Sequence, residues 1–400
     1  MSLFDDSRVS AGEVSAGRGC AGGVDDSAAD DDRGAGKEEG FLHEKFQVGN
    51  ERPFSVIYVE EKVAGSKAAE NIIRQFPKAK VIPIKHYKDV FNRGHQNYSA
   101  QHRSQALILA RKDGQLIYKG ARVCQDFGND NFYYTSCMMN CVFDCEYCFL
   151  KGMYQTGNLV VFLNLEDIFA EVEELLKEKP VYLCVSYDAD LLAIEPITGY
   201  VRRWLEFTAA HENLTIEVRT KSAYTGLFAA VGRPDDAAGA SGTDTAGCGA
   251  AAAEGRVIFA YTLSPDSVIR KMEHGTPSLA KRLYAADKAI QAGFPVRLCF
   301  DPMVYVPDWQ TEYSAMLEEV FAAIPPEKVR DFSVGTFRIG KDYLKAMRRS
   351  EPYSAVVQFP FVNDGGICYY GRELTEEMER FMLSRLSYVT SPDRIFRWEE

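Results

Sequence analysis

The sequence predicts an α/β fold, in which a partial (β/α)6 TIM-type barrel follows a small N-terminal α/β region and precedes a short C-terminal hairpin and helix. Strand-like apolar runs alternate with amphipathic helical segments from residue 131 to about residue 350. Five or six repeated βα units of this kind imply parallel strands with helices outside. A cysteine-rich loop follows the first of these strands, at the strand end where a barrel builds its active site.

Composition divides the chain into four segments. Residues 1–45 are rich in Ala, Gly, Ser and Asp and poor in large apolar side chains, so we expect a disordered acidic tail. Residues 46–130 are assigned to the N-terminal α/β region, residues 131–350 to the partial barrel and residues 351–400 to the C-terminal extension. A stretch of small and polar residues at 232–255 is expected to be a disordered insertion in the barrel.

The N-terminal region alternates β-branched or aromatic runs with a helix. We expect strands at 54–60, 80–84 and 106–110, a helix over 68–76, and a further short strand at 116–118 that pairs nearby. The basic residues that follow the second strand normally form a solvated face. In a nucleic-acid enzyme they would be candidate phosphate contacts.

The barrel region carries the regular alternation. Strands are expected at 131–136, 159–163, 181–187, 214–220, 257–263, 296–300 and 331–334, and helices at 166–177, 199–210 and 278–291 and around Met316–Phe321. The last strand is placed at 331–334. After residue 350 a glycine-bounded aromatic turn or hairpin at 365–372 and a helix through Leu374 and Leu386 replace the alternation.

The most specific motif is the spacing C-x3-C-x2-C of Cys141, Cys145 and Cys148. Iron–sulfur clusters are held by cysteine thiolates, and a cubane cluster normally takes four of them. Three cysteines leave one iron without a protein ligand, and such an iron can bind a small molecule and pass it an electron. The motif therefore predicts a [4Fe–4S] cluster with one open iron.

A zinc site is the competing interpretation. Zinc takes four nitrogen or sulfur ligands, and Cys137 would supply the fourth in a run of C-x3-C-x3-C-x2-C. No second cysteine or histidine knuckle accompanies this run, so the cluster is favoured. Cys137 is interpreted as a spare thiol near the cluster.

Bulk composition fits an intracellular metalloprotein. Five of the ten cysteines lie between Cys124 and Cys148, a distribution typical of metal binding in a reducing compartment. The chain shows neither a signal-peptide pattern nor an apolar run approaching about 18 residues, so we expect a cytoplasmic protein. Of the net charge of −11, residues 1–45 contribute −6 with 11 acidic and 5 basic residues. The mildly acidic remainder can still carry a basic groove.

The cysteine spacing, with the aromatic Tyr147 just before the last cysteine, resembles the radical S-adenosylmethionine (SAM) enzymes. In that family the open iron chelates SAM, and one electron cleaves it to a 5′-deoxyadenosyl radical. The resemblance implies two cofactors, a [4Fe–4S] cluster and S-adenosyl-L-methionine. It also implies a reductant such as flavodoxin or ferredoxin, and SAM contacts from Tyr147, Asp188 and Lys221.

From about residue 52 to residue 390, the order of features resembles the spore photoproduct lyase family. The matching runs are 57–61, 82–85, 163–169, 190–195, 220–221 and 273–276. The resemblance implies a lyase that uses the deoxyadenosyl radical to reverse a methylene-bridged thymine dimer in DNA. The lesion must leave the base stack to be reached, and a protein thiol then gives hydrogen to the thymine radical.

The same resemblance assigns roles to individual residues. Lys221 would pair with the SAM carboxylate, although a lysine at a strand end is also often a barrel-mouth ion pair. Tyr147 would stack by SAM or relay a hydrogen atom. Arg338, Tyr370 and Arg372 would lie on the DNA side, with surface salt bridges and core packing as the alternatives.

The sequence departs from the family pattern at the hydrogen donor. The family's donor cysteine falls on Tyr187, whereas Cys184 lies three residues earlier and would face the opposite side of a strand. The second aromatic residue of the cysteine loop is Phe149 instead of tyrosine. Tyr187, Tyr147 and Cys184 are therefore the candidates that could quench a substrate radical.

Three functions remain open at this stage. The favoured one is DNA repair by a radical SAM lyase of the spore photoproduct lyase type. The second is a radical SAM enzyme of the same lineage that acts on another substrate, because Tyr187 occupies the donor position. The third is a zinc-stabilised nucleic-acid-binding protein without catalysis.

Overall fold

The computed structural model describes residues 54–398, except for 121–123 and 232–254. All of these residues belong to one compact unit, Glu44–Glu400. The disorder predicted for residues 1–45 and for 232–255 lies outside the described residues, apart from Gly255.

The strands are short, and most carry buried apolar side chains. In chain order they are β1 (Val56–Glu60), β2 (Lys80–Ile84), β3 (Leu107–Ala110), β4 (Ile117–Lys119), β5 (Phe132–Thr135), β6 (Met138–Met139), β7 (Asp144–Cys145), β8 (Leu159–Phe162), β9 (Val181–Cys184), β10 (Leu214–Thr220), β11 (Val257–Thr262), β12 (Glu273–His274), β13 (Val296–Met303), β14 (Asp331–Thr336), β15 (Arg338–Gly340), β16 (Val362–Asp364), β17 (Ile367–Tyr369) and β18 (Ile395–Arg397).

The helices alternate with these strands. The α-helices are α1 (Lys67–Ile73), α2 (Lys88–Phe91), α3 (Tyr98–His102), α4 (Leu150–Met153), α5 (Leu165–Leu176), α6 (Glu195–Thr198), α7 (Tyr200–Ala209), α8 (Gly226–Val231), α10 (Asp266–Met272), α11 (Leu279–Gln291), α12 (Trp309–Ala323), α13 (Lys341–Ser350) and α14 (Arg372–Leu386). Short 3₁₀ turns are η2 (Leu192–Ile194), η3 (Pro326–Lys328) and η4 (Pro392–Arg394).

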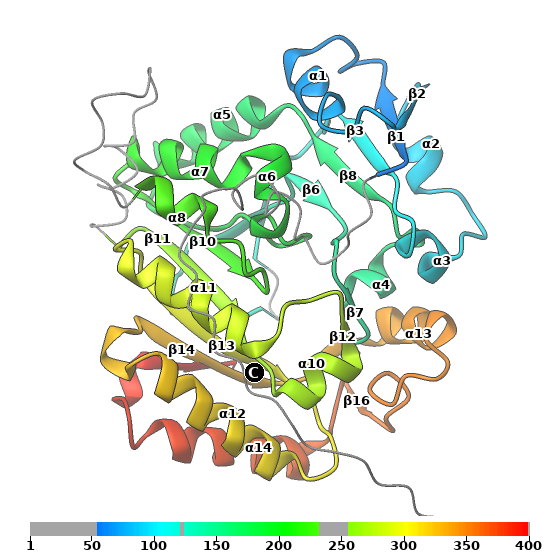
Figure 1. Ribbon diagram of the computed structural model, residues 1–400. Coiled ribbons are helices and arrows are strands. Elements are labelled where there is room, and N and C mark those ends of the chain that lie inside the picture. Colours follow the sequence, from blue (N-terminus) through cyan, green and yellow to red (C-terminus); the bar gives the residue numbers. More distant parts are fainter. Residues whose placement is uncertain (1–53, 121–123, 232–254, 399–400) are drawn as a thin grey trace, which may run out of the picture. The chain divides into compact units, whose positions relative to one another are not determined.

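The larger sheet is an open parallel barrel. Its strand order is β18-β14-β13-β11-β10-β9-β5-β4. Every neighbouring pair from β5 to β18 is parallel, and only β4 is antiparallel to its neighbour. Helices such as α7 and α11 connect successive strands, and Figure 1 shows α11 beside β13. The predicted partial barrel is confirmed.

The second sheet has the order β2-β1-β3-β8-β6. This sheet corrects one expectation, because the run at 159–163 was assigned to the barrel. Instead, β8 pairs in parallel with β3, from Leu107 opposite Leu159 to Ala110 opposite Phe162. Both strands are buried at every position, and a strand without polar–apolar alternation carries no signal for its sheet.

The short strand β4 pairs in antiparallel fashion with the next strand along the chain, β5, with Ile117 opposite Thr135, and so joins the barrel sheet. One further pairing differs from expectation. The strand β14 is not the last of the barrel, because β18 pairs with it in parallel, with Ile395 opposite Phe332. These two strands are distant in the chain, and a three-residue strand such as β18 gives too little pattern to predict its partner.

The inside of the barrel is polar at its base. Arg297 donates to Glu217 at 2.6 Å and to Asp331 at 2.9 Å. The ring of Phe127 covers the guanidinium group at 3.3 Å, and Phe396 of β18 packs edge-on against Phe127 with centroids 5.6 Å apart. This filled base leaves the carboxyl ends of the strands as the place for a site.

Candidate active site

The cysteine loop leaves the carboxyl end of β5 and is fixed to a distant segment. Within it, β7 pairs in antiparallel fashion with β12, so that Cys145 lies opposite Glu273 and Asp144 opposite His274. The backbone N–H of Glu146 also donates to the carbonyl of Met272 at 2.8 Å. The loop is therefore held by the segment between α10 and α11.

Buried polar contacts hold the other side of the loop. The Lys151 ammonium group forms ion pairs with Asp144 and with Glu351, each at 2.6 Å. The carbonyl of Cys141 accepts a hydrogen bond from Gln105 at 2.9 Å, and the ring of His102 lies 3.1 Å from the same oxygen. The loop conformation is thus set by α3, α4 and α13.

The three loop thiols influence one another's pKa. Burial raises the pKa of Cys141, Cys145 and Cys148, and their mutual repulsion raises the pKa of Cys141 and Cys145 further. Lys221 opposes this shift at Cys145 and Cys148. In the described part of the chain, no three Cys, His, Asp or Glu side chains form a ready-made metal site. Three neighbouring sulfur donors beside a lysine nevertheless have the chemistry that an iron–sulfur cluster requires.

Glu273 is the centre of a buried charge cluster beside the loop. Its carboxylate accepts hydrogen bonds from the Tyr147 hydroxyl, from Arg282, and from Ser264 at 2.8 Å. Lys221 lies 4.0 Å away and holds its ammonium group 4.9 Å from the Tyr147 ring centroid. Although burial opposes ionisation, the charges of Lys221 and Arg282 lower the pKa of Glu273 to about 2. The sequence offered Glu273 only as part of a family match and did not single out Arg282.

Lys221 is placed by the strand before it. It follows β10, and its backbone N–H donates to Asp190 at 2.7 Å, while Thr220 donates to the same carboxylate at 2.7 Å. Burial opposes the charge on Lys221, but Cys145, Tyr147 and Glu273 raise its pKa well above the usual value. It is therefore a cation at neutral pH, next to the cysteine loop.

Asp188 lies apart from this cluster. It is buried and accepts a hydrogen bond from Ser136. Burial is the main cause that raises its pKa, and Ser136 and Lys112 oppose the shift. The structure therefore brings together two of the three residues predicted to contact SAM, Tyr147 and Lys221, and places Asp188 against Ser136 at the start of the loop.

Tyr187 contacts a thiol that the sequence did not single out. Its hydroxyl oxygen lies 3.3 Å from the Cys124 sulfur, within a hydrogen bond that either group can donate. The Tyr187 ring stacks on Tyr134 at 4.1 Å and lies 5.8 Å from Phe149. Cys124 precedes Tyr187 by more than sixty residues, so no local pattern could have paired them.

Cys184 belongs to the same apolar cluster as Tyr187, together with Phe127, Phe132 and Tyr182. The strand β9 ends at Cys184, so the regular alternation of faces does not continue to Tyr187. The Cys184 thiol is buried, and burial is the main cause that raises its pKa, with Glu217 adding to the shift and Arg219 opposing it.

The three residues expected on a DNA side have different surroundings. Arg338 is mostly buried and pairs with Asp301 at 3.3 Å. Tyr370 is buried among Phe359 and other rings, and its hydroxyl accepts the backbone N–H of Tyr305 at 3.0 Å. Arg372 is exposed and pairs with Glu376 at 2.9 Å.

Cys137 is held by a contact with Trp204. Its sulfur accepts a hydrogen bond from the Trp204 indole at 3.4 Å, and burial raises its pKa to about 11. A four-cysteine zinc site would have to break this contact.

The open parallel barrel, with its three-cysteine loop after the first strand, is the fold of the radical SAM enzymes. Solved structures of spore photoproduct lyase share it over nearly their whole length. One, complexed with dinucleoside spore photoproduct, matches with a TM-score of 0.69 and 18% identity over 87% of this chain and 99% of that chain. A mutant with bound AdoMet and dinucleoside spore photoproduct gives a TM-score of 0.70 with the same identity and coverage.

Sequence comparisons lead to the same family. A model of the spore photoproduct lyase family matches residues 248–355. The spore photoproduct lyase of Bacillus subtilis is 24% identical over 218 residues, which cover 53% of this chain and 58% of that protein. The one from Geobacillus is 23% identical over 45% of this chain and 48% of its own length. The sequence matches thus span about half of the relatives' length, and the chain is related to the spore photoproduct lyases in sequence and in fold.

Within the described residues, no helix is both long and apolar enough to cross a membrane.

Proposed function

We propose that this protein is a radical SAM lyase that reverses a thymine-dimer lesion in DNA. The observation that carries the proposal is the meeting of the three-cysteine loop with Lys221. The loop follows β5 and Lys221 follows β10, and Lys221 is close enough to lower the pKa of Cys145 and Cys148. Carboxyl ends of parallel strands are where barrel enzymes place their chemistry.

Cys141, Cys145 and Cys148 would hold a [4Fe–4S] cluster, with Lys221 beside the bound SAM. When bound, the two cofactors supply one-electron cleavage of SAM and a carbon radical that removes hydrogen from the lesion. Lys221 offers a fixed cation for the SAM carboxylate. Glu273 orients this cation and at the same time holds the Tyr147 hydroxyl. The relatives solved with AdoMet and dinucleoside spore photoproduct support the assignment of both ligands.

DNA carrying a thymine photoproduct is the proposed partner, and a one-electron protein such as flavodoxin or ferredoxin the proposed reductant. Of the three residues first assigned to the DNA side, Arg372 is exposed for a phosphate contact. Arg338, in β15, and Tyr370, directly after β17, are mostly buried, so we assign them a packing role instead of a DNA contact.

The test is an anaerobic assay with reconstituted protein, dithionite, SAM and an oligonucleotide bearing the lesion. Both 5′-deoxyadenosine and restored thymine are measured. We expect the wild-type protein to form both, and Cys141→Ala, Cys145→Ala and Cys148→Ala to lose iron and SAM cleavage. Full cleavage by all three variants would overturn the assignment.

Cys137→Ala is the matched control. The Cys137 sulfur accepts the Trp204 indole N–H, and the proposal leaves this thiol out of the cluster, so this variant should keep its iron and its SAM cleavage. A colourless wild-type protein with stoichiometric zinc, released by Cys137→Ala, would support the zinc-binding alternative instead.

A second function rests on Tyr187, which the family resemblance places at the position of the donor thiol. A radical SAM enzyme of the same lineage with another substrate would form 5′-deoxyadenosine without restoring thymine. That outcome would retain the radical chemistry and exclude the lesion as substrate.

A further inference from the structure

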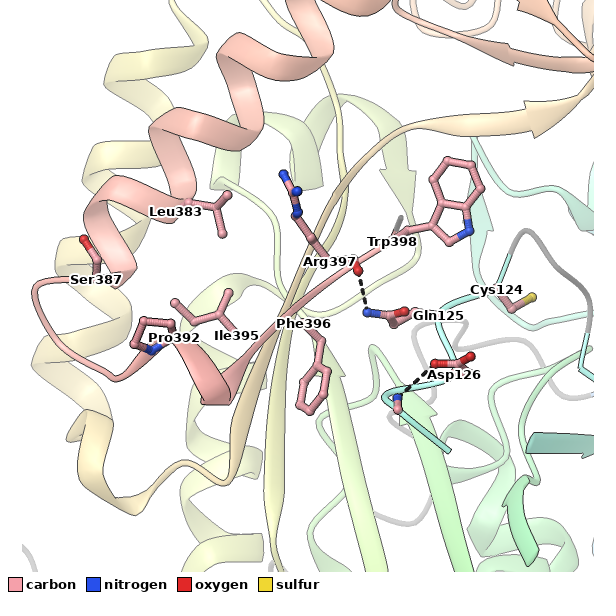
Figure 2. Close-up of a pocket in the computed structure, with 11 residues that line it drawn as sticks. Cys124, Gln125, Asp126, Leu383, Ser387, Pro392, Ile395, Phe396, Arg397 and Trp398 are labelled. Atoms are coloured by element: carbon pink, nitrogen blue, oxygen red, sulfur yellow. Dashed lines mark hydrogen bonds between the residues drawn. The ribbon is translucent and has the colours of Figure 1, made fainter. Parts of the chain in front are cut away.

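The two edges of the open barrel approach each other around a pocket. Figure 2 shows it between the segment at Cys124–Asp126 and the strand β18. The pocket has a volume of about 650 Å³ and is lined on the β18 side by Phe396, Arg397 and Trp398. Gln125 joins the edges by donating to the carbonyl of Arg397 at 2.8 Å. The pocket thus lies beside the barrel edge formed by β18 and is lined by aromatic and polar side chains.

Cys124 lines this pocket and is partly exposed. Its sulfur also forms the 3.3 Å hydrogen bond with Tyr187. One thiol therefore faces both a space for a ligand and a phenol in the protein interior.

The Tyr187 phenol lies near the end of the cysteine loop. Its ring lies 5.8 Å from Phe149, the residue directly after Cys148. Burial, together with the neighbouring Cys124 and Tyr134, raises the pKa of Tyr187, so the hydroxyl keeps its proton at neutral pH. The phenol can thus give a hydrogen atom.

Two other thiols of the barrel interior have little access to solvent. Cys184 and Cys299 are 6% and 0% exposed, and burial is the main cause that raises the pKa of both. A hydrogen-atom donor must touch the substrate radical. Among these three cysteines, Cys124 is the one that lines the pocket.

We propose that Cys124 and Tyr187 form a hydrogen-atom donor pair for the substrate radical, with the lesion base entering through the side pocket. This inference rests on the proposed function and deepens it. It also explains how a tyrosine can stand at position 187, because the thiol comes from a different segment and reaches the tyrosine hydroxyl.

The proposed transfer balances in atoms and electrons. The thymine carbon radical takes a hydrogen atom from the Cys124 thiol, so a C–H bond forms, an S–H bond breaks and a thiyl radical remains. The thiyl radical takes a hydrogen atom from the Tyr187 hydroxyl across the 3.3 Å contact. The neutral tyrosyl radical is restored by one electron from the low-potential reductant that drives SAM cleavage and one proton from water.

The first experiment runs the repair assay in D2O. The exchangeable Cys124 thiol carries deuterium there, so wild-type protein should place one deuterium in the methyl group of the restored thymine. Cys124→Ala should lower labelled thymine about tenfold or more while 5′-deoxyadenosine formation stays near wild type. Tyr187→Phe keeps the ring and removes the hydroxyl, so it should allow a first labelled turnover and reduce later ones.

Cys299→Ala is the matched control, because it removes a buried barrel thiol that does not line the pocket, and Cys184→Ala tests the other candidate thiol. Labelled thymine formed by Cys124→Ala as by wild type, or lost only in Cys184→Ala, would overturn the donor pair and leave the proposed function intact. A wild-type protein that restores no thymine would overturn the proposed function, and the donor role with it.

The second experiment needs no turnover. Reconstituted protein without SAM or reductant is treated with iodoacetamide, and the modified peptides are quantified by mass spectrometry. Cys124 should react faster than Cys184 or Cys299, and the lesion oligonucleotide should slow its modification. Equal rates with and without saturating oligonucleotide would place the lesion elsewhere and overturn the proposal.

Discussion

At the scale of single residues, the buried carboxylate of Glu273 determines how the site is charged. It contacts Tyr147 and Arg282 directly and lies 4.0 Å from Lys221. The buried Arg282 and the partly buried Lys221 thus depend on one anion. This arrangement keeps Lys221 ionised and in place beside the cysteine loop, which is what a carboxylate-bearing ligand would require.

We predict that Glu273→Gln destabilises the protein by about 3–5 kcal/mol, because it leaves Arg282 as a buried charge without its counter-ion. Urea unfolding measures this loss. Glu376→Gln, which removes the exposed partner of Arg372, is the control and should change stability by about 0–1 kcal/mol. Equal midpoints for the two variants would contradict the role of Glu273.

The same carboxylate predicts a pH dependence. Its pKa is about 2 in the folded protein, against 4.5 for an unperturbed glutamate. The unfolded state therefore binds more protons below pH 4.5, and the contribution of Glu273, fully present above this pH, is lost as the pH falls toward 2. Unfolding free energies across this range should fall more steeply for wild type than for Glu273→Gln. Parallel curves would show that Glu273 does not carry the effect.

At the scale of elements, the cysteine loop depends on the packing of α4 against α13. The helix α4 begins two residues after Cys148. A Cβ atom added at Gly152 would lie 2.6 Å from the carbonyl oxygen of Tyr343 in α13. This close backbone contact joins the loop to the C-terminal part of the chain.

We predict that Gly152→Ala costs about 1–3 kcal/mol through overpacking, and that it lowers the iron retained because α4 must move with the loop. Gly94→Ala is the control, since nothing lies within 4 Å of its added Cβ atom. Urea midpoints and iron content measure both effects. A Gly152→Ala protein with the midpoint and iron of Gly94→Ala would show that the contact can relax.

At the scale of the whole molecule, the C-terminal strand completes the barrel. The strand β18 extends the sheet beyond β14, and Phe396 reaches across the barrel to Phe127 near the opposite edge. Segments more than 260 residues apart in the chain thus line the side pocket together.

We predict that Phe396→Ala lowers stability by about 1–3 kcal/mol and speeds alkylation of Cys124, because one wall of the pocket is removed. Tyr388→Ala is the control, since this side chain is 86% exposed and its loss should change stability by less than about 0.5 kcal/mol. Unchanged Cys124 reactivity in Phe396→Ala would show that β18 does not shield the thiol.

Local patterns in the sequence were enough for much of the fold. The helix expected at 166–177 is α5 (Leu165–Leu176), and that expected at 278–291 is α11 (Leu279–Gln291). In both, one apolar face at helical spacing decides the element, and this information lies within a dozen residues. The order of βα units similarly determined that the sheet would be parallel.

Local sequence patterns did not reveal which of the two sheets each strand joins. The strand β8 has apolar residues on both faces, so its pattern fits either sheet. Only its pairing with β3, some fifty residues earlier, assigns it to the N-terminal sheet. The strand β18 was missed for a related reason, since three residues carry too little periodicity.

The sequence by itself predicted the chemistry proposed for this protein, because cysteine spacing and residue type are local properties. The spacing singled out the three loop cysteines, and the family resemblance added Tyr147 and Lys221 to the predicted site. The tertiary structure decided which side chains stand beside them. Glu273 reached Tyr147, and Cys124 reached Tyr187, only when distant segments folded together. Contacts of this kind depend on the path of the whole chain, and no pattern within one segment records them.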